Sequence, residues 1–221
     1  MVGRRRYDEG CAVAHALDVI GERWALLIIR EMLLGPKRFT DLRGGMPGAS
    51  PDVLAQRLRE LKDAGVVRQT TLPPPAASKV YELTDWGMEL EPLVTQLGHW
   101  GSRSPSLDHD AHRSIDSLVL SLRALFDPAA AKGFSATIGL RLGENVFSVK
   151  VAGGQLHLAR GKPERPTATI DTDPQTLAAL LYGGRAIKDA LRTGEVAITG
   201  ESAVVTRFLR LFPLPEPATA K

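Results

Sequence analysis

Basic residues gather in one segment of this chain, between positions 36 and 80. The segment holds eight lysines and arginines against four acidic residues, whereas residues 1–100 as a whole hold thirteen of each. A local surplus of positive charge is typical of a surface that contacts phosphate groups, although a solvated helix face gives the same pattern. Gln56 and Arg57 add a second chemistry, because glutamine can pair with adenine and arginine with guanine through two hydrogen bonds. The segment therefore predicts contacts with nucleic acid.

Other reactive groups are sparse. Cys11 is the single cysteine, so no intrachain disulfide can form, which fits a reducing cytoplasm. His109, His112 and His157 have no neighbours spaced like metal ligands. No nucleophile triad, phosphate-binding loop or pair of carboxylates is evident, so we expect no enzyme, no metal and no cofactor.

The composition indicates a globular chain with room for two domains. It has 221 residues, of which 43% are hydrophobic and 24% charged, and a formal net charge of +3. The longest apolar stretch begins at Trp24 and is interrupted by Arg30 and Glu31, so it is too short to cross a bilayer. The start MVGRRRYDEG lacks the apolar run of a secretory signal. We therefore expect a cytoplasmic protein without membrane contact.

The first hundred residues have the elements needed to present the basic segment. Apolar spacing predicts helices near residues 12–20, 24–34, 39–43 and 51–64. Ser50 and Pro51 suit the start of the fourth helix, which is expected to bury Val53, Leu54, Leu58 and Leu61. Two short strands, 66–69 and 79–83, flank the sequence LPPPAAS, and a long helix kinked at Pro92 follows Thr84. A helix-turn-helix followed by such a hairpin is a winged helix-turn-helix.

The sequence from Cys11 to about Trp100 resembles the HxlR family of winged-helix regulators. The resemblance rests on the segments IGERW, GPKRFTDL, SPDVLAQRLREL and YELTDWG taken together. It implies a homodimer held by terminal helices that binds a palindromic operator on double-stranded DNA, with repression as the usual outcome.

Each candidate DNA contact has an expected role. The second helix of a helix-turn-helix enters the major groove, so its N-terminal part reaches base edges while other basic residues fix the register on phosphates. We expect Ser50, Asp52, Gln56 and Arg57 at the bases, Lys37, Arg38 and Arg59 at phosphates, and Arg68 and Lys79 beside the wing. The wing loop departs from the family in carrying no basic residue at its tip.

Cys11 has two readings. Some members of the family use a cysteine near the start of the first helix as a redox or electrophile sensor, and a helix N-terminus lowers a thiol pKa. The alternative is a small buried residue that packs in the dimer contact.

Residues after a polar linker form a second predicted domain. We place domain 1 at 1–102, the linker at 103–113, domain 2 at 114–213 and a tail at 214–221, which gives an α+β protein. The T-D before a Leu-rich helix, the glycine pair and the segment ALRTGEVAITG resemble the sterol carrier protein type two family. That resemblance implies an apolar cavity, and the alternative is a solid core. The candidate lining residues are Leu177, Leu180, Leu181, Phe208 and Phe212.

The sequence thus predicts a DNA-binding regulator whose C-terminal domain senses an apolar ligand or assembles subunits. Two alternatives stay open. One is a lipid-binding carrier in which the winged helix only mediates dimerisation, and the other is a thiol-based sensor acting through Cys11.

Overall fold

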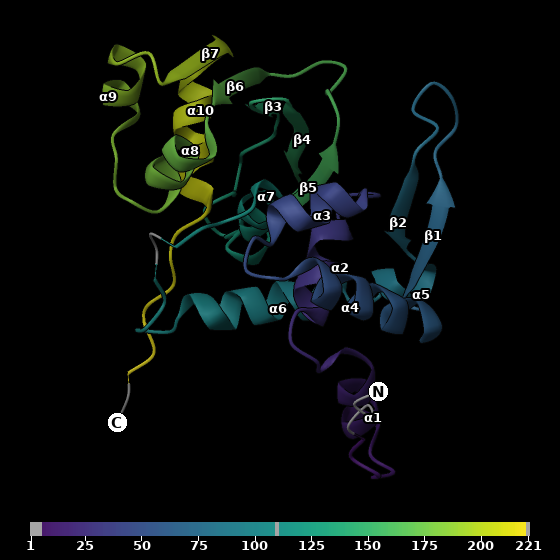
Figure 1. Cartoon of the computed structure of the whole chain (residues 1–221). Coiled ribbons are helices and arrows are strands. Elements are labelled where there is room, and N and C mark those ends of the chain that lie inside the picture. The colour runs from purple at the N-terminus through teal and green to yellow at the C-terminus, as the bar shows by residue number, and fades with distance from the viewer. Residues whose placement is uncertain (1–5, 109–110, 220–221) are drawn as a thin grey trace. The chain divides into compact units, whose positions relative to one another are not determined.

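The computed structural model describes residues 6–108 and 111–219, which form a mixed α and β protein (Figure 1). The chain divides into two compact units, Met1–Val94 and Thr95–Lys221. This division lies eight residues before the end of the first domain that the sequence predicts at position 102. The predicted linker positions 109–110 and tail positions 220–221 lie outside the described residues.

Four helices, a hairpin and a short fifth helix build the N-terminal unit. The expected order of helices and strands is confirmed as far as the second strand of the hairpin, with ends that shift by at most two residues. The elements are α1 (Ala12–Ile20), α2 (Ala25–Met32), α3 (Phe39–Gly45), α4 (Pro51–Asp63), β1 (Val67–Thr71), β2 (Lys79–Leu83) and α5 (Asp85–Met88).

Helix α4 follows α3 across a tight turn and begins as its sequence predicts. The Ser50 hydroxyl accepts a hydrogen bond from the Val53 amide at 3.3 Å, and proline occupies the first helical position. Leu54, Leu58 and Leu61 are buried, and their spacing gives one apolar stripe. The expectation that Val53 joins this stripe is wrong, because its side chain points off the stripe and is 38% exposed.

The wing is a two-stranded antiparallel sheet whose register runs from Val67 opposite Leu83 to Thr71 opposite Lys79. Lys37 extends this sheet by one residue: its amide donates to the Tyr81 carbonyl at 2.9 Å, and the Tyr81 amide donates back at 2.8 Å. The segment between α2 and α3 is therefore fixed against the base of the wing.

The long kinked helix predicted after Thr84 is two helices. Thr84 caps α5 by accepting from the Gly87 amide at 3.0 Å, and α6 (Glu91–Ser102) starts three residues after α5 ends. Pro92 is the second residue of α6. A proline is tolerated in the first turn because the amide there has no partner within the helix.

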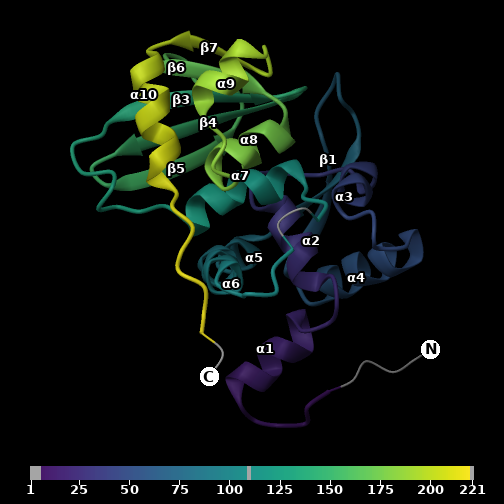
Figure 2. The same ribbon diagram turned by 90° about the vertical axis from the view of Figure 1, so that its left-hand side faces the viewer.

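The C-terminal unit is a five-stranded sheet with helices on one face. The strand order is β5-β4-β3-β6-β7, antiparallel except for the parallel pair β3 and β6. Helices α8 and α10 lie over one face (Figure 2). The elements are α7 (Ile115–Ala124), β3 (Ala136–Leu142), β4 (Asn145–Ala152), β5 (Gln155–Arg160), β6 (Ala168–Thr172), α8 (Pro174–Leu181), α9 (Ile187–Arg192), β7 (Val196–Gly200), α10 (Ser202–Phe208) and a final 3₁₀ turn, Leu209–Leu211.

The core of this unit follows from alternation along the strands. Ile138, Leu140, Phe147, Val149 and Ile170 point to the helix-covered face and are fully buried. Their burial fixes the register, since a shift by one residue would turn every one of them to the other face.

Candidate nucleic-acid interface

Four side chains along the first turns of α4 form its exposed face, opposite its leucine stripe. They are Asp52, Val53, Gln56 and Arg59, and each is exposed. We call this set the α4 outer face. Because it covers the N-terminal half of the second helix of the helix-turn-helix, it is the surface that this motif presents to base edges.

Arg57 does not lie freely on this face. Its side chain is 18% exposed, and its guanidinium donates to the Glu60 carboxylate at 2.5 Å and lies 3.5 Å from the Glu22 carboxylate. Glu22 belongs to the turn between α1 and α2, 35 positions earlier in the sequence. Arg57 therefore ties α4 to that turn, and a contact with guanine would require it to leave both carboxylates.

The Gln56 amide is also engaged within the helix. Its Nε2 donates to Glu60 at 2.7 Å, and its Oε1 accepts from Arg59 at 2.6 Å. A two-bond contact with adenine uses both of these amide atoms. Gln56 and Arg57, two of the four residues expected at the bases, thus have intramolecular partners, and their roles at DNA stay predictions.

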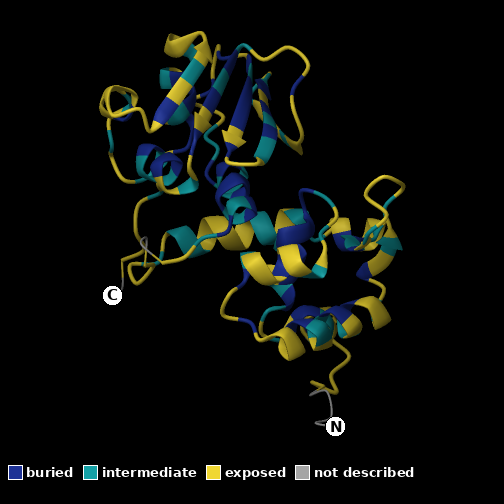
Figure 3. Ribbon diagram, turned by 45° about the horizontal axis from the view of Figure 1, so that its top comes forward, coloured by how far each residue is buried: buried dark blue, intermediate teal, exposed yellow. Residues whose placement is uncertain are grey.

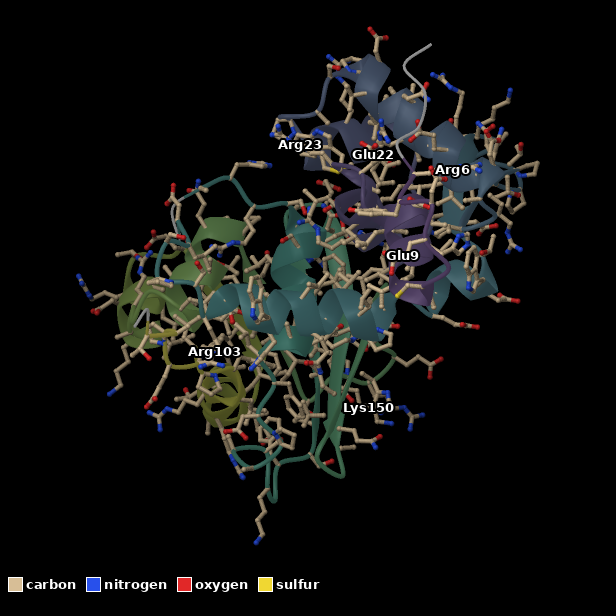
Figure 4. The ribbon with its side chains drawn as sticks, turned by 90° about the horizontal axis from the view of Figure 1, so that it is seen from below. Arg6, Glu9, Glu22, Arg23, Arg103 and Lys150 are labelled. Atoms are coloured by element: carbon tan, nitrogen blue, oxygen red, sulfur yellow. The ribbon has the colours of Figure 1, made fainter. Side chains whose placement is uncertain are left out.

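The turn between α1 and α2 packs against the helix-turn-helix. Figure 4 labels Glu22 and Arg23 in this turn. Trp24 follows in the left-handed region with φ of 78°, which is uncommon for a bulky residue, and the Arg23 guanidinium lies 5.1 Å from the centre of its ring. A Cβ placed on Gly48 would come within 3.0 Å of the Trp24 ring. Trp24 therefore packs on the turn just before α4, a contact that the sequence did not reveal.

Charged residues lie at both ends of the wing strands, with Arg68 and Glu82 at the base and Lys79 beside the tip. Arg68 donates to Glu82 at 2.8 Å across the strand pair, and this bond raises the pKa of the arginine. Arg38 donates to the Ser78 hydroxyl at 3.1 Å, and Lys79 is exposed at the start of β2. The expected wing residues thus lie on one hairpin, whose tip, residues 73–77, is exposed and uncharged.

Cys11 precedes α1 and is exposed, so the expected buried packing does not hold within one chain. The backbone amides of Ala14 and then Val13 lower the pKa of its thiol below the ordinary value. A lowered pKa raises the thiolate fraction, which is the reactive form.

Helix α6 contains no buried residue over its twelve positions (Figure 3). Leu93, Leu97 and Trp100 recur at helical spacing and are 45%, 44% and 74% exposed. Val13 and Leu17 are likewise exposed on α1, at 68% and 41%. A helix with an apolar stripe that stays in water is the pattern of a surface that packs against another chain.

Of the five residues expected to line an apolar pocket, four are buried, and none lines the hollow beside α8; their role at a ligand stays a prediction. Phe208 and Phe212 pack edge to face, with ring centres 5.1 Å apart. Leu177 and Leu180 are buried, and Leu181 is half-buried.

A hollow of about 390 Å³ lies on the other side of α8, lined by Leu118, Ala178, Ala179 and Tyr182 among others. The Tyr182 hydroxyl bonds to Ser121 at 2.7 Å, and burial raises the pKa of Tyr182 to about 12. The phenol therefore stays neutral at physiological pH.

Neither a cluster of metal ligands nor a membrane-spanning helix occurs among the described residues. No group of three or more histidine, cysteine, aspartate or glutamate side chains there is placed to hold a metal, and His109 lies outside them. None of the helices in the described ranges has the length and hydropathy of a membrane-spanning segment.

Two family models divide the chain. The HxlR-like helix-turn-helix family matches residues 19–108, and the alkyl sulfatase C-terminal family matches residues 109–218. The second description differs from the sterol carrier resemblance, which stays a prediction.

Individual relatives match the N-terminal part. The HTH-type transcriptional regulator YvaP of Bacillus subtilis is 34% identical over 87 residues, which are 39% of this chain and 81% of YvaP. YybR of the same organism, also an HTH-type transcriptional regulator, is 38% identical over 93 residues, 42% of this chain and 74% of its own. A solved structure of the redox regulator HypR in its oxidised form is 34% identical, with a TM-score of 0.41, and covers 44% of this chain and 100% of HypR. With its helix-turn-helix and wing, the chain belongs to the HxlR family of helix-turn-helix transcriptional regulators.

Proposed function

We propose that this regulator represses transcription as a homodimer that binds a palindromic operator, with α4 in the major groove. The observation that carries this proposal is the α4 outer face. It presents an acidic, an apolar, an amide and a basic side chain in water on the helix that a helix-turn-helix inserts into DNA.

Phosphate contacts complete the proposed interface. Arg59 is exposed on the outer face, and Lys37 and Arg38 precede α3 and lie beside β2 of the wing. Asp52 would be repelled by phosphate, so it faces a base edge, where a carboxylate can accept from the cytosine amino group. The uncharged wing tip adds little electrostatic attraction.

The test is selection of bound sequences from random double-stranded DNA with the full chain, followed by binding at several salt concentrations. We expect a two-fold symmetric site. Arg59→Ala should weaken all sequences alike and reduce the slope of log K against log salt by about one per half-site. If the selection enriches no two-fold symmetric site, the proposal is wrong. Placing the selected site over a promoter in a transcription assay then tests repression against activation.

We also propose that the C-terminal unit is an input domain of the sterol carrier type that takes an apolar effector. The hollow beside α8 supports this, since its volume lies in the range of small-molecule sites and its lining includes leucine, alanine and proline side chains. The five residues predicted to line the pocket would shape the domain behind the hollow rather than touch the effector.

A second candidate input is oxidation of Cys11. Its exposure and lowered pKa favour this role. Peroxide or quinone treatment should then change operator affinity of the native chain and leave the Cys11→Ser chain unaffected. An equal response of both chains would remove Cys11 as the sensor.

A further inference from the structure

Val53 is the apolar member of the α4 outer face. It is the third residue of the helix, directly after Pro51 and Asp52, and 38% of its surface is exposed. The leucine stripe of α4 is complete without it, because Leu54, Leu58 and Leu61 are all 1% exposed or less. A valine in this place therefore adds little to the core of the unit.

Three polar side chains near Val53 are already engaged in intramolecular bonds, whereas Val53 is available to contact a base edge. The Ser50 hydroxyl is occupied as the cap, the Gln56 amide is bonded at both ends, and Arg57 lies between two carboxylates. Val53 stands one turn before Gln56 and Arg57 on the same side of the helix. It needs no hydrogen-bond partner, so presenting it to DNA breaks no existing contact.

The chemistry of the major groove selects the partner. The C5 methyl of thymine is the apolar group among the base edges there, and apolar side chains recognise it. A valine in a helix holds essentially one χ1 rotamer, so its two methyl groups are already fixed in direction before DNA binds.

We propose that Val53 is a specificity-determining residue that recognises thymine in each half-site through the C5 methyl group. This proposal rests on the proposed insertion of α4 into the major groove. It goes beyond that function by naming the base that the α4 outer face selects and the atom group that it reads.

The test replaces single thymines of the selected operator by deoxyuridine, which pairs identically and lacks only the methyl group. With the native chain, one symmetric pair of replacements should weaken binding by about fourfold per half-site, the factor for one buried methyl-sized group. Val53→Ala should lose the same factor on the thymine operator and bind the thymine and uracil operators equally. Val53→Thr keeps one methyl and should fall between the two.

Arg59→Ala is the matched control from the same exposed face. It should weaken both operators and preserve the native ratio between them. The assignment of Val53 is overturned if no uracil replacement weakens binding. It is also overturned if Val53→Ala leaves the ratio of the affinities for the thymine and uracil operators unchanged. An absent operator would instead refute the proposed DNA-binding mode, so the two failures are distinct.

Discussion

At the scale of single residues, Arg57 combines a position on α4 with ion pairs to Glu60 and Glu22. Sequence spacing predicted that it reads a guanine, whereas its contacts with Glu60 and Glu22 make it a brace between α4 and the turn before α2. The two roles differ in what a substitution does. A base reader affects one position of the operator, and a brace affects the orientation of the whole helix.

We expect Arg57→Ala to act as loss of a brace. The free energy of unfolding should fall by about 0.5–1 kcal/mol, a value reduced for solvent screening because both carboxylates are partly exposed. Operator variants should weaken by similar factors. Urea unfolding and binding to a panel of single-base operator variants provide the measurements.

Glu22→Gln is the matched control, because it removes one charge of the brace at a site outside α4. It should reproduce part of both effects. If Arg57→Ala instead abolishes discrimination at one guanine, by about 1–3 kcal/mol, and leaves stability intact, the base-reading role is correct.

At the scale of elements, the junction between the wing and α5 has no spare room. A Cβ on Gly87 would lie 2.2 Å from the Val66 carbonyl oxygen, which belongs to the residue before β1. The Thr84 amide donates to the same carbonyl at 3.0 Å. Backbone therefore meets backbone here, and neither side can yield by rotating a side chain.

We predict that Gly87→Ala destabilises the N-terminal unit by about 1–3 kcal/mol, the range for overpacking in a tight interior. Gly44→Ala is the matched control in α3, where a Cβ meets nothing within 4 Å. Alanine there should stabilise the unit by about 0.5–1 kcal/mol. Chemical denaturation of the native, Gly87→Ala and Gly44→Ala chains measures both effects. Equal stability of the native and Gly87→Ala chains would contradict the observed packing.

Helix α6 is the element whose exposed apolar stripe needs a partner. Because its leucines and Trp100 remain in water in one chain, we expect this stripe to pack against the second subunit. A buried interface of this kind does not tolerate an unpaired carboxylate.

Leu97→Glu should therefore shift the chain toward monomer at micromolar concentration in sedimentation, and weaken binding to a two-half-site operator. Gln155→Glu adds the same charge at an exposed polar position of β5, outside the stripe, and should leave the dimer intact. A native chain that sediments as a monomer would remove the basis for a two-fold operator.

At the scale of the whole molecule, regulation requires that effector binding to the C-terminal unit and DNA binding by the N-terminal unit are energetically coupled. An effector that binds equally to the DNA-competent and DNA-incompetent states shifts neither population, whatever its affinity. The effector site and the operator therefore have to be measured on the same chain.

We predict that decanol raises the melting temperature of the full chain and changes its operator affinity. Ala178→Phe, which fills the hollow beside α8, should suppress both effects, and Ala130→Phe, at an exposed position outside that lining, should suppress neither. A thermal shift without any change in operator affinity would show binding without regulation.

The sequence by itself determined the local elements of this protein. The Ser50 cap, the glycine stops and the leucine spacing of α4 act within a few residues, and the alternation along β2 and β3 reports a sheet with one buried face. Together with the basic segment, these signals sufficed to predict the helix-turn-helix, its wing and a candidate surface for DNA.

Only the tertiary structure decided which side chains of that surface remain available. Val53 fits the apolar period equally well inside or outside the core, and in the fold it is 38% exposed while the three leucines of α4 are buried. Arg57 finds Glu22 across 35 positions, a pairing that no local pattern encodes. Likewise, Leu177 and Leu180 of α8 are buried, whereas Ala178 and Ala179 of the same helix line the hollow. Periodicity specifies a face of a helix, whereas packing from distant parts of the chain decides what that face meets.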